Sequence, residues 1–358
     1  MYKSLIRPVL FSLDPEHAHH LTMRMGNFAN KMGLIPFVDK LYKKEDSRLQ
    51  QKIFGLNFKN PVGLAAGSDK NCEAQEMMAA FGFGFLESVS FTFQAQDGNP
   101  RPRMFRFPAD NAVINRLGFP TIGAEALVPK IIEAKRNVQK VSGAIFGVNF
   151  GKSKVVALED AVNDYLNSFR LMKDIADYIV INVSSPNTPG LRTLQEGTRL
   201  NEILSSLQKE NTKHIPLLVK VAPDLTFPEL DEAIEAAVNN NLQGIVATNT
   251  TKSREGLSST PNQEGGMSGK PLFPKSIEFV RYIRKQLQGK LKIIGVGGIS
   301  SAADAIEMFR SGADLIELYT GLIYQGPRVA YDIKCGLLKY MDQNDCKSIS
   351  EVVGSGNQ

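Results

Sequence analysis

The stretch that decides the fold is AIFGVNFGKSKVVALEDAVNDYLNSFRLMKDIADYIVINVSS, residues 144–185. It contains an apolar run at 144–150, a helix-like pattern at 157–175 and a second apolar run at 178–183. Runs that are apolar throughout are typical of strands buried on both faces of a parallel sheet, and a helix between two of them is the usual crossover. The stretch therefore predicts a strand–helix–strand unit.

The same alternation extends in both directions from this unit. Further apolar runs lie at residues 62–66, 84–91, 216–221, 244–248, 292–296 and 314–319, with helical patterns such as 228–239 and 300–310. Eight such units over about 280 residues predict an α/β protein with a (β/α)8 TIM barrel, whose usual size is about 250 residues. The alternative is a doubly wound sheet, which would place a glycine-rich turn after its first strand. No GxGxxG follows residues 62–66, so the barrel is favoured.

Residues 1–45 are predicted to form a pair of amphipathic helices ahead of the barrel. Apolar residues such as Leu21, Met25 and Phe28 recur there at helical spacing, and Lys and Arg outnumber Asp and Glu. Composition leaves two interpretations open: helices packed on the body of the protein, or a helical pair on a membrane surface or at an apolar tunnel. The expected divisions are 1–45 for the helical segment, 46–345 for the barrel and 346–358 for a C-terminal tail.

Composition excludes several classes of protein. The 358 residues carry 42 Lys and Arg against 37 Asp and Glu, a formal charge of +5, and no basic block indicates a nucleic-acid surface. The 3 cysteines lie far apart, which argues against a disulfide framework or a metal site and favours a reducing compartment. No apolar run has the length of a membrane span, and no targeting segment is recognised at the start.

Polar side chains in otherwise apolar runs predict a lined pocket at one end of the barrel. Asn149, Asn182, Lys220 and Asn249 occur at similar depth in consecutive units, and active sites of TIM barrels lie at the carboxyl ends of the strands. The amides offer donors and acceptors to a flat polar ligand, and the lysine would stabilise negative charge on it. Lys70 follows the small residues of AAG (65–67), where a planar group can approach the backbone closely.

The last two strands end in sequences that favour phosphate binding. GVGGIS (295–300) and LYTG (318–321) follow them, and GGMSGKP (265–271) is expected in the preceding loop. Loops after strands seven and eight of TIM barrels commonly bind phosphate through backbone N–H groups and a helix N-terminus. Gly297 and Gly298 fit that role, with Ser300 as the expected helix cap. This pattern indicates a phosphate-bearing cofactor.

The loop SSPNTPGLRTLQEG (184–197) supplies the candidate base. Neither cysteine, histidine nor carboxylate stands at the end of the preceding run, so a hydroxyl is the candidate by elimination. The loop is long enough to act as a lid and presents Ser185, Asn187 and Thr188. A serine is a poor base unless it is relayed to a stronger acceptor or to water, and Thr188 is the candidate relay.

Together these segments are similar to class 2 dihydroorotate dehydrogenase, the membrane-associated, quinone-using branch of this flavin enzyme of pyrimidine biosynthesis. The resemblance covers roughly residues 5–340, and its stretch 90–100 departs from the family pattern. The motifs that carry it are DPEHAHH (14–20), NPVGLAAGSDKN (60–71), INRLGFP (114–120), GVNFGKSK (147–154), INVSSPNTPGLR (181–192), VKVAPD (219–224), ATNTT (247–251), GGMSGKPL (265–272), GVGGI (295–299) and LYTGLIYQGP (318–327).

The resemblance implies one FMN per chain, oxidation of dihydroorotate to orotate, and reduction of ubiquinone or menaquinone. Ser185 matches the family's base, with hydride passing to flavin N5, and His19 and Arg106 match polar residues of the quinone tunnel. The implied FMN positions are Ala66, Gly67, Ser68, Asp69, Lys70, Ser90, Asn149, Asn182, Lys220, Thr248, Gly269, Gly298, Tyr319 and Thr320. The implied substrate positions are Lys70, Asn115, Arg116, Leu117, Gly118, Phe119, Asn182, Asn187, Asn249 and Thr250.

The resemblance also implies a peripheral monomer at the cytoplasmic face of the cell membrane, docked through residues 1–45 and without a nucleic-acid partner. Three other functions are weighed against it. A hydroxy-acid oxidase would need a histidine base, and the only histidine near a barrel strand is His214. A lyase or aldolase would use Lys220 or Lys70 as a Schiff-base amine. A non-catalytic phosphate-binding barrel gives no reason for a lysine and three asparagines in one pocket.

Overall fold

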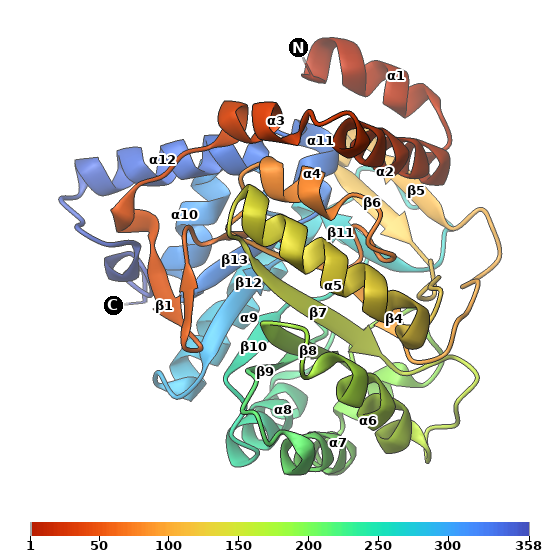
Figure 1. Ribbon diagram of the computed structural model, residues 1–358. Helices are drawn as coiled ribbons and strands as arrows, with labels where there is room; N and C mark the ends of the chain where they lie inside the picture. Colours follow the sequence, from red (N-terminus) through yellow and green to blue (C-terminus); the bar gives the residue numbers. More distant parts are fainter. Residues whose placement is uncertain (1, 358) are drawn as a thin grey trace.

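The computed structural model describes residues 2–357, the side chain of Ser88 excepted, and it confirms the predicted TIM barrel (Figure 1). Every neighbouring pair of barrel strands is parallel, and the last strand closes on the first. In barrel order the strands are β3 (Val62–Leu64), β4 (Phe85–Thr92), β7 (Ile145–Gly151), β8 (Tyr178–Asn182), β9 (Leu217–Val221), β10 (Gly244–Ala247), β12 (Lys292–Val296) and β13 (Leu315–Leu318).

Helices surround the barrel and are set by local signals in the sequence. Thr226 and Glu229 form a reciprocal capping box at the start of α8, with Pro228 in its first turn. The expected cap at Ser300 is wrong by one residue, because Ser301 accepts from the Asp304 amide at the start of α10. The helices are α4 (Gln75–Ala80), α5 (Ala124–Val141), α6 (Ala161–Met172), α7 (Gly197–Glu210), α8 (Phe227–Asn239), α9 (Phe273–Leu287), α10 (Ala302–Arg310), α11 (Thr320–Gln325) and α12 (Val329–Gln343).

The amino end of the barrel is closed by a hairpin and filled with apolar side chains. Strands β1 (Gln51–Ile53) and β2 (Leu56–Phe58) form the hairpin, and Phe58 packs edge-on against Phe85 inside the barrel. Gly147 leaves room for the ring of Tyr178, since a Cβ there would lie 2.2 Å from the ring Cζ. This end of the barrel is therefore a packed floor, and a ligand can enter only from the carboxyl ends of the strands.

A small antiparallel sheet stands over the carboxyl ends of the barrel strands (Figure 1). It contains β5 (Met104–Phe107), β6 (Ala112–Asn115) and β11 (Gly266–Gly269), with β6 in the middle. Residues 265–271 are expected from the sequence to form a loop, and this expectation is wrong for 266–269. This glycine-rich segment becomes a strand because its backbone pairs with β6, a long-range contact that local composition does not encode.

The N-terminal segment is helical as predicted, but it holds three α-helices rather than a pair: α1 (Arg7–Ser12), α2 (Pro15–Lys31) and α3 (Ile35–Tyr42). Asp14 separates the first two, because its carboxylate accepts the amides of Glu16 and His17, each at 3.0 Å. Gly33, at φ 70°, ends α2. Among residues 2–357, none of the helices has both the length and the apolar character needed to cross a membrane.

Both ends of the chain pack on the body of the protein. The Tyr2 hydroxyl donates to the Ile323 carbonyl in α11 at 2.7 Å. In the C-terminal residues, Ile349 and Val352 are buried and the Gly354 amide donates to the Phe309 carbonyl at 2.9 Å. The remaining short helices are η1 (Tyr2–Ile6), η2 (Ser47–Leu49), η3 (Pro108–Asp110), η4 (Leu191–Gln195), η5 (Lys270–Leu272) and η6 (Ile349–Glu351).

Candidate active site

A cavity of about 1110 Å³, counting space that opens to solvent, lies at the carboxyl ends of the barrel strands. Its lining combines a few polar groups with apolar walls, as expected for a small-molecule site. The predicted positions that line it are Ala66, Gly67, Lys70, Ser90, Asn115, Leu117, Gly118, Phe119, Asn182, Ser185, Asn187, Lys220, Thr248, Asn249, Thr250, Gly269, Gly298, Tyr319 and Thr320.

Four predicted contact residues do not line this cavity. The Asp69 carboxylate instead accepts the amides of Glu73 and Ala74, each at 2.8 Å, just ahead of α4. The Ser68 hydroxyl donates to the Ala65 carbonyl at 3.1 Å. Arg116 lies over the ring of Phe105, and Asn149 is fully buried below the cavity. Their side chains support neighbouring residues, which sequence spacing alone does not distinguish from ligand contact.

Ser185 follows β8 at the start of the predicted lid loop and lines the cavity. Its Oγ accepts the Asn187 amide at 3.3 Å, and the Asn187 Nδ2 donates to Asn115 Oδ1 on β6 at 3.2 Å. Two buried atoms of this loop, Asn187 Oδ1 and Thr188 Oγ1, have no hydrogen-bond partner among the described residues. Buried polar atoms without a partner are costly, so these two are suited to meet a ligand or water.

The asparagines form a connected network across neighbouring strands. Asn182 Nδ2 donates to Asn149 Oδ1 at 3.0 Å, and Asn249 Nδ2 donates to Ser184 Oγ at 2.9 Å. Asn149 Nδ2 in turn donates to the carboxylate of Glu87 at 2.9 Å. These bonds fix the orientation of each amide, so the cavity presents a preset pattern of donors and acceptors.

The two predicted lysines are in different surroundings. Lys70 Nζ donates to the Gly67 carbonyl at 2.5 Å, and burial lowers the pKa of Lys70 to about 8. Lys220 Nζ contacts Glu87 Oε1 at 3.2 Å and Glu317 Oε2 at 3.9 Å. Both carboxyls are fully buried, and the sequence analysis missed them. An acidic residue inside each apolar run, Glu87 in 84–91 and Glu317 in 314–319, was the signal that could have identified them.

Glycines let the backbone form one wall of the cavity. Gly297 and Gly298 follow β12 with φ of 126° and 75°, and Gly269 ends β11 with φ 102°. A Cβ at Gly298 would lie 2.8 Å from the backbone nitrogen of Phe273, so a side chain does not fit there. The Tyr319 hydroxyl is buried and has no partner among the described residues. A glycine backbone without side chains suits a phosphate group, and the phosphate site stays a prediction.

Four further wall residues were not named from the sequence. Met104, Val113 and Ser268 come from the small sheet, and Ile323 comes from α11. The three apolar ones carry no local mark of a binding site, because the same residue types fill the core.

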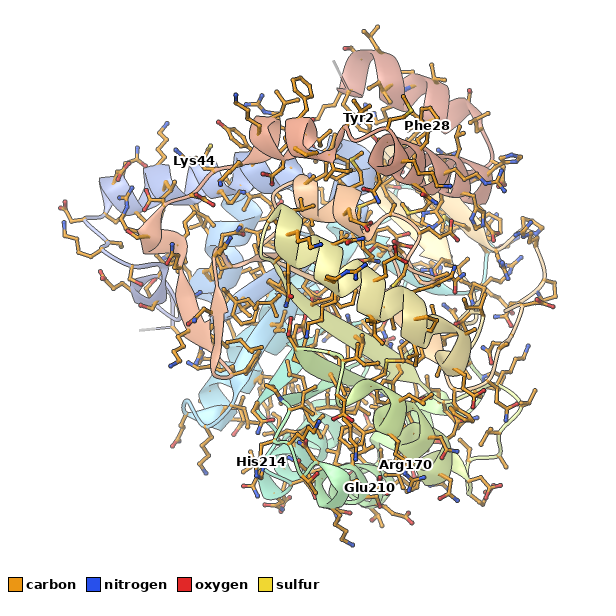
Figure 2. The ribbon with its side chains drawn as sticks, viewed as in Figure 1. Tyr2, Phe28, Lys44, Arg170, Glu210 and His214 are labelled. Atoms are coloured by element: carbon orange, nitrogen blue, oxygen red, sulfur yellow. The ribbon has the colours of Figure 1, made fainter. Side chains whose placement is uncertain are left out.

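Neither His214 nor His19 is a residue at the carboxyl end of a barrel strand. His214 precedes β9, and Figure 2 shows it at the end of the molecule opposite Tyr2 and Phe28. It therefore lies at the amino end of its strand and does not serve a hydroxy-acid oxidase mechanism here. His19 lies on α2, where burial and then the Lys70 charge lower its pKa to about 3. Arg106 donates to the carbonyl of Leu10 at 2.9 Å and to that of Leu13.

Comparison with known proteins agrees with this geometry. The family described as "Dihydroorotate dehydrogenase" matches residues 48–341. The chain belongs to the dihydroorotate dehydrogenase family. A protein of Nostoc punctiforme named dihydroorotate dehydrogenase (quinone) is 48% identical, over 99% of this chain and 98% of that one. One of Trichodesmium erythraeum with the same name is 45% identical, over 100% of this chain and 99% of that one.

Solved structures of the family have the same fold. The crystal structure of the Eimeria tenella enzyme in complex with ferulenol matches with a TM-score of 0.86 and 35% identity, over 98% of this chain and 99% of that one. The ligand-free structure from the same organism matches with a TM-score of 0.85 and 36% identity, over 96% of this chain and 100% of that one. The likeness therefore includes the N-terminal helices as well as the barrel.

Proposed function

We propose that this chain oxidises dihydroorotate to orotate and reduces a membrane quinone, with FMN as its cofactor. One observation carries the proposal: Ser185, a fixed asparagine network, two lysines and a glycine backbone meet in a single cavity. The chain that forms this cavity belongs to the dihydroorotate dehydrogenase family. The relatives named dihydroorotate dehydrogenase (quinone) cover nearly the whole chain and support the choice of acceptor.

The residues of the cavity fit FMN. When bound, FMN supplies a two-electron carrier between dihydroorotate and the quinone. The backbone at Gly297 and Gly298 would hold its phosphate, and Lys220 would stabilise negative charge on its ring. The remaining FMN positions named from the sequence are part of this proposal, with Ser68, Asp69 and Asn149 acting through their neighbours.

Ser185 is the proposed base and removes a proton from C5 of dihydroorotate. Ser185 lines the cavity, and the unpartnered Thr188 Oγ1 in the same loop is the proposed relay to water. Asn115, Asn187 and Asn249 would orient the planar substrate through hydrogen bonds.

The N-terminal helices are the proposed membrane and quinone-binding segment. They carry a cluster of exposed apolar side chains, whereas isolated exposed apolar residues are ordinary. The cluster consists of Leu5, Ile6, Val9, Leu13, Leu21, Met25, Phe28, Met32, Leu34, Phe37 and Leu41. His19 on α2 and Arg106, which donates to the carbonyls of Leu10 and Leu13, are proposed to line the quinone path. Docking is proposed at the cytoplasmic face of the cell membrane.

An anaerobic absorbance spectrum, taken before and after addition of dihydroorotate, tests the proposed function. We expect a flavin band that bleaches with dihydroorotate and returns with a soluble quinone but not with NAD or fumarate. A flavin band that does not bleach would exclude this substrate. Absence of flavin after reconstitution would overturn the cofactor and favour a lyase with Lys220 or Lys70 as Schiff-base amine, which borohydride would trap.

A further inference from the structure

Three ionisable side chains meet inside the barrel, between the apolar floor and the cavity. Lys220 comes from β9, Glu87 from β4 and Glu317 from β13, and both carboxyls are 0% exposed. Lys220 Nζ lies 3.2 Å from Glu87 Oε1 and 3.9 Å from Glu317 Oε2. Lys220 also lines the cavity, so the charge of its ammonium acts directly on a ligand bound there.

The charges of the three groups do not balance if all of them are ionised. Two carboxylates and one ammonium would leave one net negative charge in a water-free interior, which is strongly unfavourable. Tyr178 from β8 and Asn149 from β7 face the same space, and neither supplies a positive charge. The phenol pKa of Tyr178 is raised well above its usual value by burial and then by the two carboxyls.

The hydrogen bonds of the two carboxyls lead to the same imbalance. Glu87 Oε1 receives Asn149 Nδ2 and Lys220 Nζ. The other three oxygens, Glu87 Oε2 and both of Glu317, accept no N–H or hydroxyl from the described residues. The two carboxyls are close enough to hydrogen-bond to each other, and burial, then the Glu87 charge, raises the pKa of Glu317 well above its usual range. A proton on one carboxyl is therefore the donor available to the other.

We infer that Glu87 and Glu317 share a single proton beneath Lys220, which makes the three side chains a neutral unit and fixes the charge that Lys220 presents to the cavity. The proton lies in an O–H···O bond between the carboxyls, and the remaining negative charge balances the ammonium. Glu87 and Glu317 are positioning residues, since they act on a ligand only through Lys220. Either carboxyl can be the ionised one, so the unit tolerates the loss of one acid but not of both.

Infrared spectroscopy of the purified protein tests the shared proton directly. We expect the wild type at neutral pH to have a protonated-carboxyl C=O band that is lost in both Glu317→Gln and Glu87→Gln, because the one acid that remains ionises against Lys220. Asp164→Asn is the matched control, since Asp164 is a buried carboxylate that receives the Ser153 amide at 2.7 Å and is expected to leave the band intact. Absence of the band in wild type, or its survival in Glu87→Gln, would overturn the inference.

The reduction potential of bound FMN tests the effect on the cavity, and this readout rests on the proposed function. We expect each single glutamine variant to keep the wild-type potential at neutral pH. The double variant Glu87→Gln/Glu317→Gln leaves Lys220 unbalanced, so we expect a more positive potential. A positive shift in each single variant of about half the shift in the double variant would mean that both carboxyls are ionised, which contradicts the inference.

Equilibrium unfolding provides a readout that does not require flavin. Because the pKa of Glu317 is raised in the folded state, the wild type loses stability as pH rises from the unfolded value of 4.5 towards the folded pKa. One proton corresponds to about a tenfold change in the unfolding constant per pH unit. We expect Glu317→Gln to remove this dependence, and an unchanged slope would count against the shared proton. If the protein binds no FMN but Glu317→Gln removes the pH dependence of unfolding, the proposed function is rejected and the shared proton is retained.

Discussion

Arg103 and Glu16 form a buried ion pair that fastens α2 to the wall of the cavity. Arg103 Nη2 lies 2.7 Å from Glu16 Oε1, and Arg103 Nε donates to the same oxygen at 3.1 Å. The two side chains are 7% and 9% exposed. Arg103 directly precedes β5, whose first residue, Met104, lines the cavity. The proposed membrane segment is thus tied to the site by a polar contact as well as by apolar packing.

Glu16→Gln is expected to destabilise the protein by roughly 3–5 kcal/mol, because it removes the negative charge that balances the buried Arg103 guanidinium. Urea unfolding measures the loss, and proteolysis of residues 2–42 under native conditions should become faster. The control is Arg101→Gln, since Arg101 is 66% exposed and lies 3.2 Å from the same carboxylate. That variant should lose less than about 1 kcal/mol. Equal losses of stability in the two variants would contradict a dominant role for the buried Arg103–Glu16 pair.

The same ion pair predicts sensitivity to acid. Burial alone would raise the pKa of Glu16, but hydrogen bonds and charge from Arg103 lower it overall. A lowered folded-state pKa means that the stabilisation is present above the ordinary value of 4.5 and is lost as pH falls below it. Unfolding of wild type and Glu16→Gln should therefore converge below that pH. If the two unfolding free energies differ by the same amount at all pH values, ionisation of Glu16 is not the source of the acid sensitivity.

Ser185→Ala is expected to keep FMN but to slow flavin reduction by dihydroorotate by about 10²–10⁴-fold, the usual contribution of a general base. Stopped-flow absorbance under anaerobic conditions measures the rate. Ser185→Cys is the matched variant, because a thiolate restores a base, and its rate should recover as pH rises. Normal flavin reduction in Ser185→Ala would show that another group takes the proton.

The apolar cluster on the N-terminal helices predicts membrane binding. Phe28→Ser combined with Phe37→Ser should reduce co-sedimentation with lipid vesicles and raise the KM for a long-chain quinone, because 63% and 65% of these side chains are exposed. Flavin reduction by dihydroorotate should not change. Val155→Ser is the control, since Val155 is 75% exposed outside these helices. Loss of vesicle binding in the control as well would indicate a non-specific effect.

Gly147→Ala tests the packed floor of the barrel. The added Cβ would lie 2.2 Å from Cζ of the buried Tyr178 ring, so we expect a loss of about 1–3 kcal/mol or more from overpacking. Thermal unfolding measures the change. In a Tyr178→Leu background the shorter side chain leaves room, and the cost of Gly147→Ala should fall. If Gly147→Ala destabilises both backgrounds equally, the strain does not come from contact with the Tyr178 ring.

The barrel was predictable from sequence because its strands are buried on both faces and read as uninterrupted apolar runs. The cavity position followed from Asn182 and Lys220 at the ends of those runs. The small sheet was not predictable, because β11 is glycine-rich and becomes a strand only through pairing with β6. Glu87 and Glu317 were missed for another reason: an acid inside a barrel is meaningful only once its distance to Lys220 is known.

The pairing of β6 with β11 has a consequence for how the protein is made. Four barrel strands, β7 to β10, lie between the two in the chain. Gly269 and Asn115 line the same cavity. They can meet only after the nascent chain has emerged from the ribosome as far as Gly269, well past the middle of the sequence. Domains with such long-range contacts form late in synthesis. The binding cavity is thus assembled late in translation, so binding of the proposed FMN would mark a chain that has finished folding.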